Sequence, residues 1–265
     1  MTTPDRPGRL LLVSIGPGNH EQLTGRASRA LREAEVVVGY KSYLRLVAPL
    51  LGEKETVGSG MRQELERCTL AVRLAQAGKI TALISSGDVG VYGMAGPAFE
   101  VLLEAGWRPG AGIEVEVIPG VSAINACASL VGAPLTHDFC TISLSDLLTP
   151  WPRIRKRLEA AASADFVTAL YNPRSSKRIS QIEEARSIFL AHRATTTPVA
   201  VITAAFREDA NVILTDLAGF LDHPIGMETT VLIGNSSSFA QGGVMVTPRG
   251  YTGKYDLERI VHGPR

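Results

Sequence analysis

The sequence predicts an α/β fold made of two successive series of strands and helices. Short apolar runs without polar alternation recur along the chain, as is typical of buried parallel strands. Stretches with apolar residues at helical spacing follow most of these runs, and glycine-rich turns separate the two. The length of 265 residues suits two moderate domains. We place the domains at residues 1–118 and 119–250, and we expect residues 251–265 to form a mobile tail.

The first series begins with the apolar run of residues 10–15, which leads into the turn Gly16-Pro17-Gly18. A helix follows, and residues 36–39 form the second strand. Further on, residues 113–118 alternate in polarity, which predicts a strand near the edge of the sheet. Between these strands, spacing by fours and threes predicts the buried face of an amphipathic helix at Met61, Leu65, Cys68, Val72 and Ala75.

Residues 82–93 form the stretch around which this first series is organised. An apolar run breaks into a loop with Gly87, Gly90 and Gly93, and a helical pattern follows. A strand, a glycine loop and a helix are the arrangement in which a sheet presents backbone amides to a ligand at its carboxyl edge. Asp88 adds a carboxylate to that loop; its alternative role is that of a helix cap in an ordinary turn.

The second series has a less regular alternation of strands and helices, which predicts a partly antiparallel sheet. Four basic residues between positions 153 and 157 interleave with Ile154 and Leu158, as on the outer face of an amphipathic helix. The predicted strands are residues 140–144, 166–171, 198–203, 211–215 and 229–234.

Composition excludes several classes of protein. The formal net charge is +1, so no global field favours nucleic acid or a membrane surface. Cys68, Cys127 and Cys140 are widely spaced in apolar context, which predicts neither a disulfide framework nor a metal site. The chain has no run of about 20 apolar residues and no apolar signal core, so we expect a cytoplasmic protein.

A dinucleotide-binding site is a poor fit to the first glycine turn. The fingerprint requires a third glycine where this chain has Glu21, and an acid where the second strand ends at Gly39-Tyr40. Pro17 removes one amide donor from the loop. An NAD-dependent oxidoreductase is therefore disfavoured.

Three motifs in sequence resemble the tetrapyrrole methylase family, whose members use S-adenosylmethionine. They are residues 14–18, 86–93 and 118–123, and their order and spacing match over residues 9–240. Residues 144–151 and 170–178 are similar to one branch in particular, which methylates C17 of precorrin-3B and contracts the ring to give precorrin-4. The resemblance implies the two-domain class III methyltransferase fold, with the active site in the interdomain cleft.

The resemblance also implies site residues, a cofactor and an assembly state. The product would be S-adenosylhomocysteine, and the chain would form a homodimer. The expectation of no nucleic-acid and no membrane partner comes instead from the net charge of +1 and the lack of a membrane-spanning apolar run. The catalytic candidates are Asp88, Tyr92 and Asp146, and Arg174, Lys177 and Arg178 are candidates for holding the carboxylates of the macrocycle. The cofactor-binding candidates are Pro17, Gly87, Asp88, Val91, Tyr92, Ser122, Ala123, Tyr171, Asn172, Ala204 and Asn235.

Several alternatives stay open from the sequence. A cobalt-containing ring could replace the metal-free one, or methylation could occur at another ring carbon. A relative that methylates RNA would be expected to carry a basic tract with stacking aromatics, and the aromatic content here is only 6%. A carrier that binds the corrinoid without turnover is the alternative of a different class.

Overall fold

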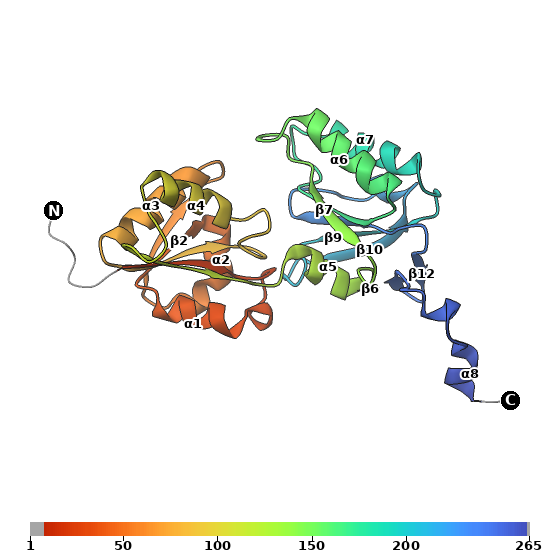
Figure 1. The fold of residues 1–265 in the computed structure, drawn as a ribbon, viewed down its shortest axis with the longest axis horizontal. Helices are drawn as coiled ribbons and strands as arrows, with labels where there is room; N and C mark the ends of the chain where they lie inside the picture. The colour runs from red at the N-terminus through yellow and green to blue at the C-terminus, as the bar shows by residue number, and fades with distance from the viewer. Residues whose placement is uncertain (1–7, 264–265) are drawn as a thin grey trace. The chain divides into compact units, whose positions relative to one another are not determined.

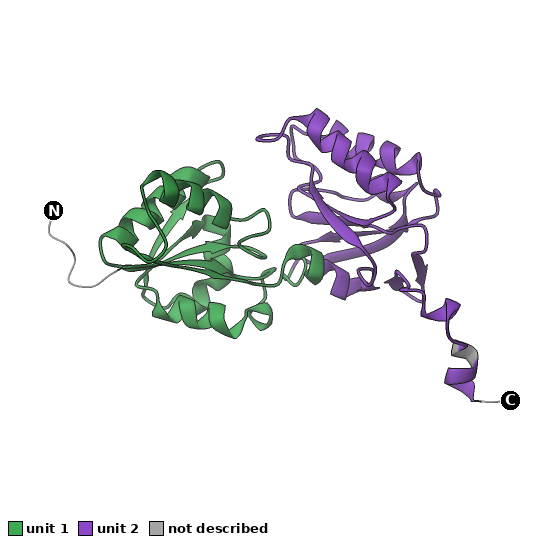
Figure 2. Cartoon of the chain, viewed as in Figure 1, with its two compact units in different colours: residues 1–126, 205–208 green, residues 127–204, 209–265 purple. Residues whose placement is uncertain are grey.

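The computed structural model describes residues 8–263, and its contacts divide the chain into two compact units (Figure 2). The first unit contains residues up to Ala126 together with Ala205–Glu208, and the second contains the remainder. The α/β class is confirmed. The units part within helix α5 (Ala123–Val131), whereas the sequence places a domain boundary after residue 118.

The first unit is built on a parallel sheet with the strand order β3-β2-β4-β1-β5. Its strands are β1 (Arg9–Ser14), β2 (Val36–Tyr40), β3 (Glu55–Ser59), β4 (Ile80–Ser85) and β5 (Glu114–Ile118). The connecting helices are α1 (Gly25–Glu33), α2 (Lys41–Leu51), α3 (Glu64–Gln76) and α4 (Ala95–Glu104), with the 3-10 turn η1 (His20–Gln22). As the alternating pattern predicts, β5 lies at an edge of the sheet.

Both faces of this sheet are covered, which explains the continuous apolar strands (Figure 1). On one face Leu11 and Val13 pack with α1 and α2, and on the other Leu10 and Leu12 pack with α3 and α4. The helices that follow the adjacent strands β1 and β4 therefore lie on opposite faces. In open α/β sheets, such a switch point opens a crevice at the carboxyl ends of the two strands.

The predicted buried face of α3 is only partly correct. Cys68, Val72 and Ala75 are buried, but Met61 precedes the helix and is 63% exposed, and Leu65 is 56% exposed. Arg67 is buried instead, because its guanidinium donates to the hydroxyl of Ser59 (2.7 Å) and to the Gly60 carbonyl (2.9 Å). The spacing of apolar residues along the sequence cannot predict a buried arginine whose donors are satisfied in this way.

The second unit contains a mixed sheet with the order β10-β9-β11-β8-β7, and the prediction of partly antiparallel pairing is confirmed. Its strands are β7 (Phe139–Ser143), β8 (Val167–Tyr171), β9 (Pro198–Thr203), β10 (Asn211–Asp216) and β11 (Thr229–Ile233). A small additional sheet joins β6 (Gly132–Ala133), β12 (Phe239–Gln241) and β13 (Val244–Val246).

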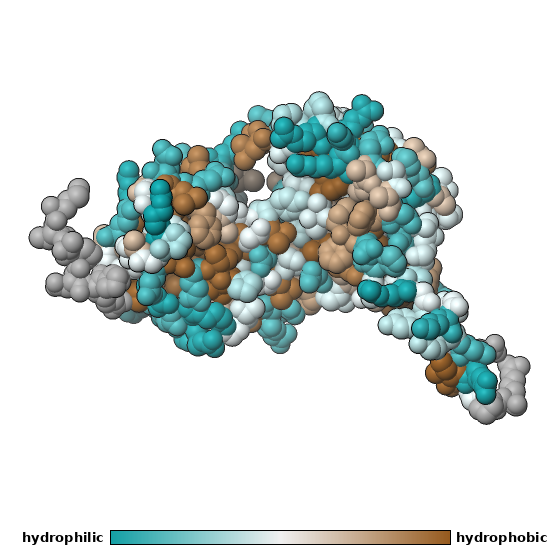
Figure 3. Space-filling model, in the orientation of Figure 1, coloured by the Kyte–Doolittle hydropathy of each residue, from teal (hydrophilic) through white to brown (hydrophobic). Residues whose placement is uncertain are grey.

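Helices α6 (Trp151–Ser163) and α7 (Ser180–Leu190) cover one face of the mixed sheet (Figure 1). Ile154 and Leu158 are buried in this core, while the basic residues between positions 153 and 157 are exposed. The predicted outer face of this helix is therefore confirmed, and Figure 3 shows a mostly hydrophilic surface over α6.

The 3-10 turn η2 (Phe220–Asp222) lies between β10 and β11, and the 3-10 turn η3 (Tyr251–Gly253) and helix α8 (Leu257–His262) follow β13. The mobility expected for residues 251–265 stays a prediction. Among the described residues, no helix combines the length and apolar character needed to cross a membrane.

Candidate functional site

Two glycine loops meet at the switch point of the first unit. Gly16 follows β1 and Gly87 follows β4, and the two residues exchange backbone hydrogen bonds in both directions, at 3.1 and 2.7 Å. Gly87 has a φ of +67°, in the left-handed region that favours glycine. The central stretch of the sequence therefore folds as predicted, with its loop at the carboxyl edge of the sheet.

Asp88 holds this region together through both carboxylate oxygens. Oδ1 accepts the backbone N–H of Gly90 (2.8 Å), and Oδ2 accepts that of Gly120 (2.9 Å). Ser14 Oγ accepts the N–H of Val89 at 2.8 Å. The carboxylate thus ties the loop after β4 to the turn after β5.

The turn at Gly120 approaches the first two loops closely. A Cβ at Gly120 would lie 2.5 Å from the Ser14 Cβ and 2.9 Å from the Gly87 carbonyl oxygen, so only glycine fits. A Cβ at Gly87 would lie 3.6 Å from the Ala123 nitrogen and 3.8 Å from the Ser122 Cα. Ser122 and Ala123, at the start of α5, therefore lie beside the loop after β4.

Val91 and Tyr92 form the exposed part of the same loop, at 37% and 53% exposure. Tyr92 has a φ of 52°, an uncommon conformation for a bulky side chain that often marks functional loops. The first unit brings together all the predicted cofactor residues that precede residue 127: Pro17, Gly87, Asp88, Val91, Tyr92, Ser122 and Ala123.

Arg207 also belongs to this group of loops, although no sequence pattern predicts it. It donates through Nε to the Pro17 carbonyl (2.9 Å) and through Nη2 to the Ser86 hydroxyl (3.4 Å). Its position 190 residues beyond Pro17 hid the contact, because no local pattern links the two. The sequence does offer one signal, Gly18, because the missing Cβ at this position leaves room for the Arg207 side chain.

In the second unit, a further cluster lies at the carboxyl ends of the parallel strands β7 and β8. Ser143 pairs with Tyr171 in register, and Ser143 Oγ accepts the Asn172 amide N–H at 3.0 Å. Ala204 follows β9 at the same edge, because Thr203 and Leu170 both lie near the start of the antiparallel strand β11. Tyr171, Asn172 and Ala204 thus share one edge of this sheet.

Asn235 lies at the opposite edge of this sheet from Tyr171, Asn172 and Ala204, and its role in cofactor binding stays a prediction. It follows the carboxyl end of β11, whose last residue Ile233 pairs with Thr168 at the start of β8. Its side-chain oxygen accepts the N–H of Ser237 at 3.0 Å. Because β11 runs antiparallel to β8, Asn235 lies at the opposite edge and shapes a turn there.

The predicted catalytic Asp146 and the basic residues follow β7 and β8. Arg178 is buried, and it donates to the Pro173 carbonyl (3.3 Å) with Asp146 at 3.8 Å, so it pins its own loop. Burial lowers the pKa of Arg178, with Asp146 opposing the shift. Arg174 is half-buried and Lys177 is exposed, and these two are the better placed for a charged ligand.

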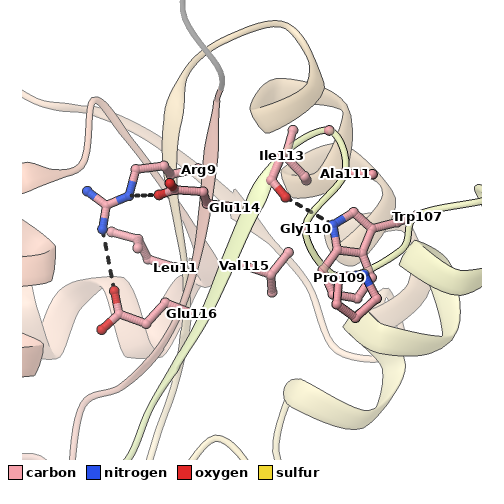
Figure 4. A pocket seen from close by; sticks show the side chains of 11 residues that line it. Arg9, Leu11, Trp107, Pro109, Gly110, Ala111, Ile113, Glu114, Val115 and Glu116 are labelled. Atoms are coloured by element: carbon pink, nitrogen blue, oxygen red, sulfur yellow. Dashed lines mark hydrogen bonds and ion pairs between the residues drawn. The ribbon is translucent and has the colours of Figure 1, made fainter.

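A pocket of about 550 Å³ lies at the other end of the first sheet and is distinct from these loops (Figure 4). Arg9, which lines the pocket, pairs with Glu114 (3.2 Å) and Glu116 (3.4 Å), and Trp107 Nε1 donates to the Ile113 carbonyl (3.0 Å). The polar groups of the pocket thus bind one another.

The loops of the first unit fit S-adenosylmethionine by their chemistry. The exposed apolar Val91 and the exposed ring of Tyr92, on a loop that lies beside Ser122 and Ala123, suit an adenosyl and methionine ligand. Burial raises the pKa of the Cys68 thiol to about 12 and that of the Cys127 thiol to about 11.

Known proteins resemble this chain over most of its length. Residues 9–220 match the family model described as Tetrapyrrole (Corrin/Porphyrin) Methylases. The cobalt-factor III methyltransferase of Priestia megaterium is 53% identical over 95% of this chain, which spans only 47% of that protein. The probable cobalt-factor III C(17)-methyltransferase of Salmonella typhimurium is 48% identical, over 92% of this chain and 99% of that protein. The precorrin-3B C(17)-methyltransferase of a Sinorhizobium species is 37% identical, over 93% and 98%.

Solved structures show the same fold. The methyltransferase CobJ superposes with a TM-score of 0.84 at 34% identity, covering 91% of this chain and all (100%) of that one. The uroporphyrin-III C-methyl transferase of Thermus thermophilus, complexed with S-adenosylhomocysteine, superposes at 0.67 with 26% identity, over 86% of this chain and 97% of that one. With a family match over residues 9–220 and relatives matched over nearly their whole length, this chain belongs to the tetrapyrrole methylase family.

Proposed function

We propose that this chain is an S-adenosylmethionine-dependent methyltransferase of cobalamin biosynthesis that methylates C17 of a tetrapyrrole and promotes its ring contraction. The observation that carries the proposal is the meeting of the Gly16 and Gly87 loops at the switch point of the first sheet. The names of the relatives supply the reaction and the ring position.

In this mechanism the loops of the first unit chiefly bind S-adenosylmethionine and orient its methyl group. S-adenosylmethionine supplies an activated methyl group, so the protein needs to hold it in line with the ring carbon at roughly 3–3.5 Å and to exclude water. Asp88 fixes the loop after β4 through Gly90 and Gly120. With both oxygens accepting backbone N–H groups, Asp88 is better suited to positioning than to proton transfer.

The substrate is a flat macrocycle with many carboxylates, and the second unit offers matching chemistry after β7 and β8. Arg174 and Lys177 supply positive charge. Leu147 and Leu148, in the loop after β7, are 66% and 92% exposed, an unusual state for adjacent leucines. We propose that these leucines contact the face of the ring.

Ring contraction requires proton movement, and Tyr92 and Asp146 are the proposed groups. Tyr92 is exposed on the loop after β4. Asp146 accepts the Gln181 amide N–H through Oδ2 at 2.8 Å, which orients its carboxylate. The hydroxyl of Tyr92 can act as an acid, and the carboxylate of Asp146 as a base.

We propose the cobalt-containing ring as the preferred substrate, with metal-free precorrin-3B as the alternative. The relatives at 53% and 48% identity are named for cobalt-factor III, and the one at 37% is named for precorrin-3B. We also propose a homodimer, as the family resemblance implies, and no nucleic-acid partner. Ile260 and Val261 of α8, 65% and 70% exposed, offer apolar surface for a second copy.

The test is incubation with methyl-labelled S-adenosylmethionine and each macrocycle in parallel, followed by mass spectrometry and absorption spectroscopy. The proposal predicts a gain of one methyl group on the ring, with the spectral change of contraction and faster turnover of the cobalt form. Binding of the ring with no effect of the methyl donor would indicate a carrier, and label in RNA would overturn the assignment.

A further inference from the structure

Arg207 lies on a short segment that belongs to the first unit. Ala205–Glu208 packs with the first unit, although the strands β9 and β10 on either side of it belong to the second. The backbone of this turn is unusual, because Ala204 and Phe206 have φ values of 50° and 61°. Left-handed conformations at such residues cost energy and persist where surrounding contacts fix them.

The guanidinium of Arg207 connects both glycine loops at once. Nε donates to the Pro17 carbonyl at 2.9 Å, in the loop after β1. Nη2 donates to the Ser86 hydroxyl at 3.4 Å, in the loop after β4, and that hydroxyl in turn donates to the Gly16 carbonyl at 3.5 Å. A planar group with several fixed donors can hold two acceptors in one geometry, which a lysine cannot do.

Gly18 shows that the sequence makes room for this side chain. It has a φ of +141°, and a Cβ there would lie 2.7 Å from Cγ and 2.9 Å from Nε of Arg207. Any other residue would displace the arginine stem. The second glycine of the turn, which suggests a phosphate site when considered alone, therefore serves the packing of Arg207.

We infer that Arg207 is a positioning residue for the methyl donor: it fixes the Pro17 carbonyl and the Ser86 hydroxyl, and with them the loops that bind the sulfonium cofactor. The inference rests on the proposed function of these loops. It adds a fourth segment to the cofactor site, contributed by the turn that follows Ala204.

The test compares Arg207→Ala and Arg207→Lys with the wild type by calorimetric titration of S-adenosylhomocysteine. Loss of a charge-assisted hydrogen bond predicts a rise in Kd of about tenfold for the alanine variant and a smaller rise for lysine. The KM of the macrocycle and the melting temperature are expected to stay near the wild-type values. Arg249→Ala is the matched control, because exposed Arg249 also donates to a backbone carbonyl, that of Thr136 (3.4 Å).

Gly18→Ala supplies the second arm. It is expected to raise the same Kd, and combining it with Arg207→Ala is expected to add little, because both changes remove one contact. An unchanged Kd in Arg207→Ala overturns the inference, and so do equal losses for cofactor and macrocycle or fully additive effects. A wild-type chain that binds no S-adenosylhomocysteine would instead refute the proposed function.

Discussion

At the scale of single residues, a few side chains hold backbone groups of the loops in place. Asp88 and Arg207 each join two loops of the first unit. In the second unit, Arg193 has a similar role. Its buried guanidinium donates to the carbonyls of Gly234 and Phe166, the latter at 2.6 Å. Because each of these side chains fixes backbone groups, we expect its replacement to weaken ligand binding where those groups belong to the proposed site. We expect it to lower the free energy of unfolding where they belong to the buried interior.

Replacement of Asp88 by alanine is expected to weaken S-adenosylhomocysteine binding at least tenfold while the fold is retained, because two backbone N–H groups lose their acceptor. Asp88→Asn, which keeps one acceptor oxygen, is expected to lose less. Calorimetric titration measures the Kd, and Asp222→Ala, an exposed acid of the second unit, is the control. An alanine variant with wild-type affinity would remove Asp88 from the site.

Replacement of Arg193 by alanine is expected to cost about 3–5 kcal/mol in the free energy of unfolding, because buried carbonyls lose a charged donor. Burial lowers the pKa of Arg193, and Asp165, whose Oδ1 lies 3.7 Å from Nε, opposes that shift. Urea denaturation gives the difference, with Arg153→Ala on the exposed face of α6 as the control. A loss no larger than that of the control would contradict this role.

Cys68 and Cys127 are expected to make the fold sensitive to alkali. Burial raises the pKa of these thiols from an ordinary 9.0 to about 12 and about 11. Above pH 9 the unfolded chain loses these protons while the folded chain keeps them. The free energy of unfolding therefore falls as pH rises towards the folded values, by about 1.4 kcal/mol per pH unit for each thiol. Urea denaturation below and above pH 9 measures the slope, which should be shallower in Cys68→Ala; an identical slope would be contrary to expectation.

At the scale of elements, the sequence predicted those strands and helices whose apolar residues face a core. The buried strands β1 and β4 and the helix α6 follow their patterns. Edge strand β3 was missed because Glu55–Ser59 has no apolar run, and β6 was missed because it has only 2 residues. At the start of α3, buried Arg67 took the place expected for Leu65, because hydrogen bonds offset the cost of burying its charge.

The loop after β7 provides a test at this scale. Leu148→Ser is expected to raise the KM of the macrocycle about tenfold, since about 1.5 kcal/mol or more of apolar contact with the ring would be lost. The Kd of S-adenosylhomocysteine is expected to be unchanged. Steady-state kinetics with each substrate varied in turn measures both effects, and Leu103→Ser, another exposed leucine, is the control. A rise in the Kd of S-adenosylhomocysteine without a rise in the KM of the macrocycle would contradict the proposed contact between Leu148 and the ring.

At the scale of the whole molecule, the division into two units was only partly accessible from the sequence. A series of strands and helices ending near β5 was visible, but the return of Ala205–Glu208 to the first unit was not, because its contacts span 190 residues between Arg207 and Pro17. The placement of Asn235 and Ala204 at opposite edges of the second sheet was also not accessible from the sequence. Strand direction decides at which edge a loop lies, and direction in a mixed sheet does not follow from the order of elements along the chain.

Because the net charge is only +1, recognition of the proposed polyacidic ring would depend on local residues. Replacing both Arg174 and Lys177 by alanine is therefore expected to raise the KM of the macrocycle and to weaken its dependence on salt, with little change in the Kd of the cofactor. Kinetics at low and high ionic strength measure this. An unchanged salt dependence would place the carboxylates of the ring elsewhere.

The central claim is that the loops after β1 and β4 hold the methyl donor. A crystal structure of the chain with S-adenosylhomocysteine tests it most directly. The account predicts the nucleoside and the methionine portion against Pro17, Gly87, Val91 and Ala123, with Arg207 still bound to the Pro17 carbonyl. A ligand found elsewhere, with these loops making no contact to it, would contradict the account.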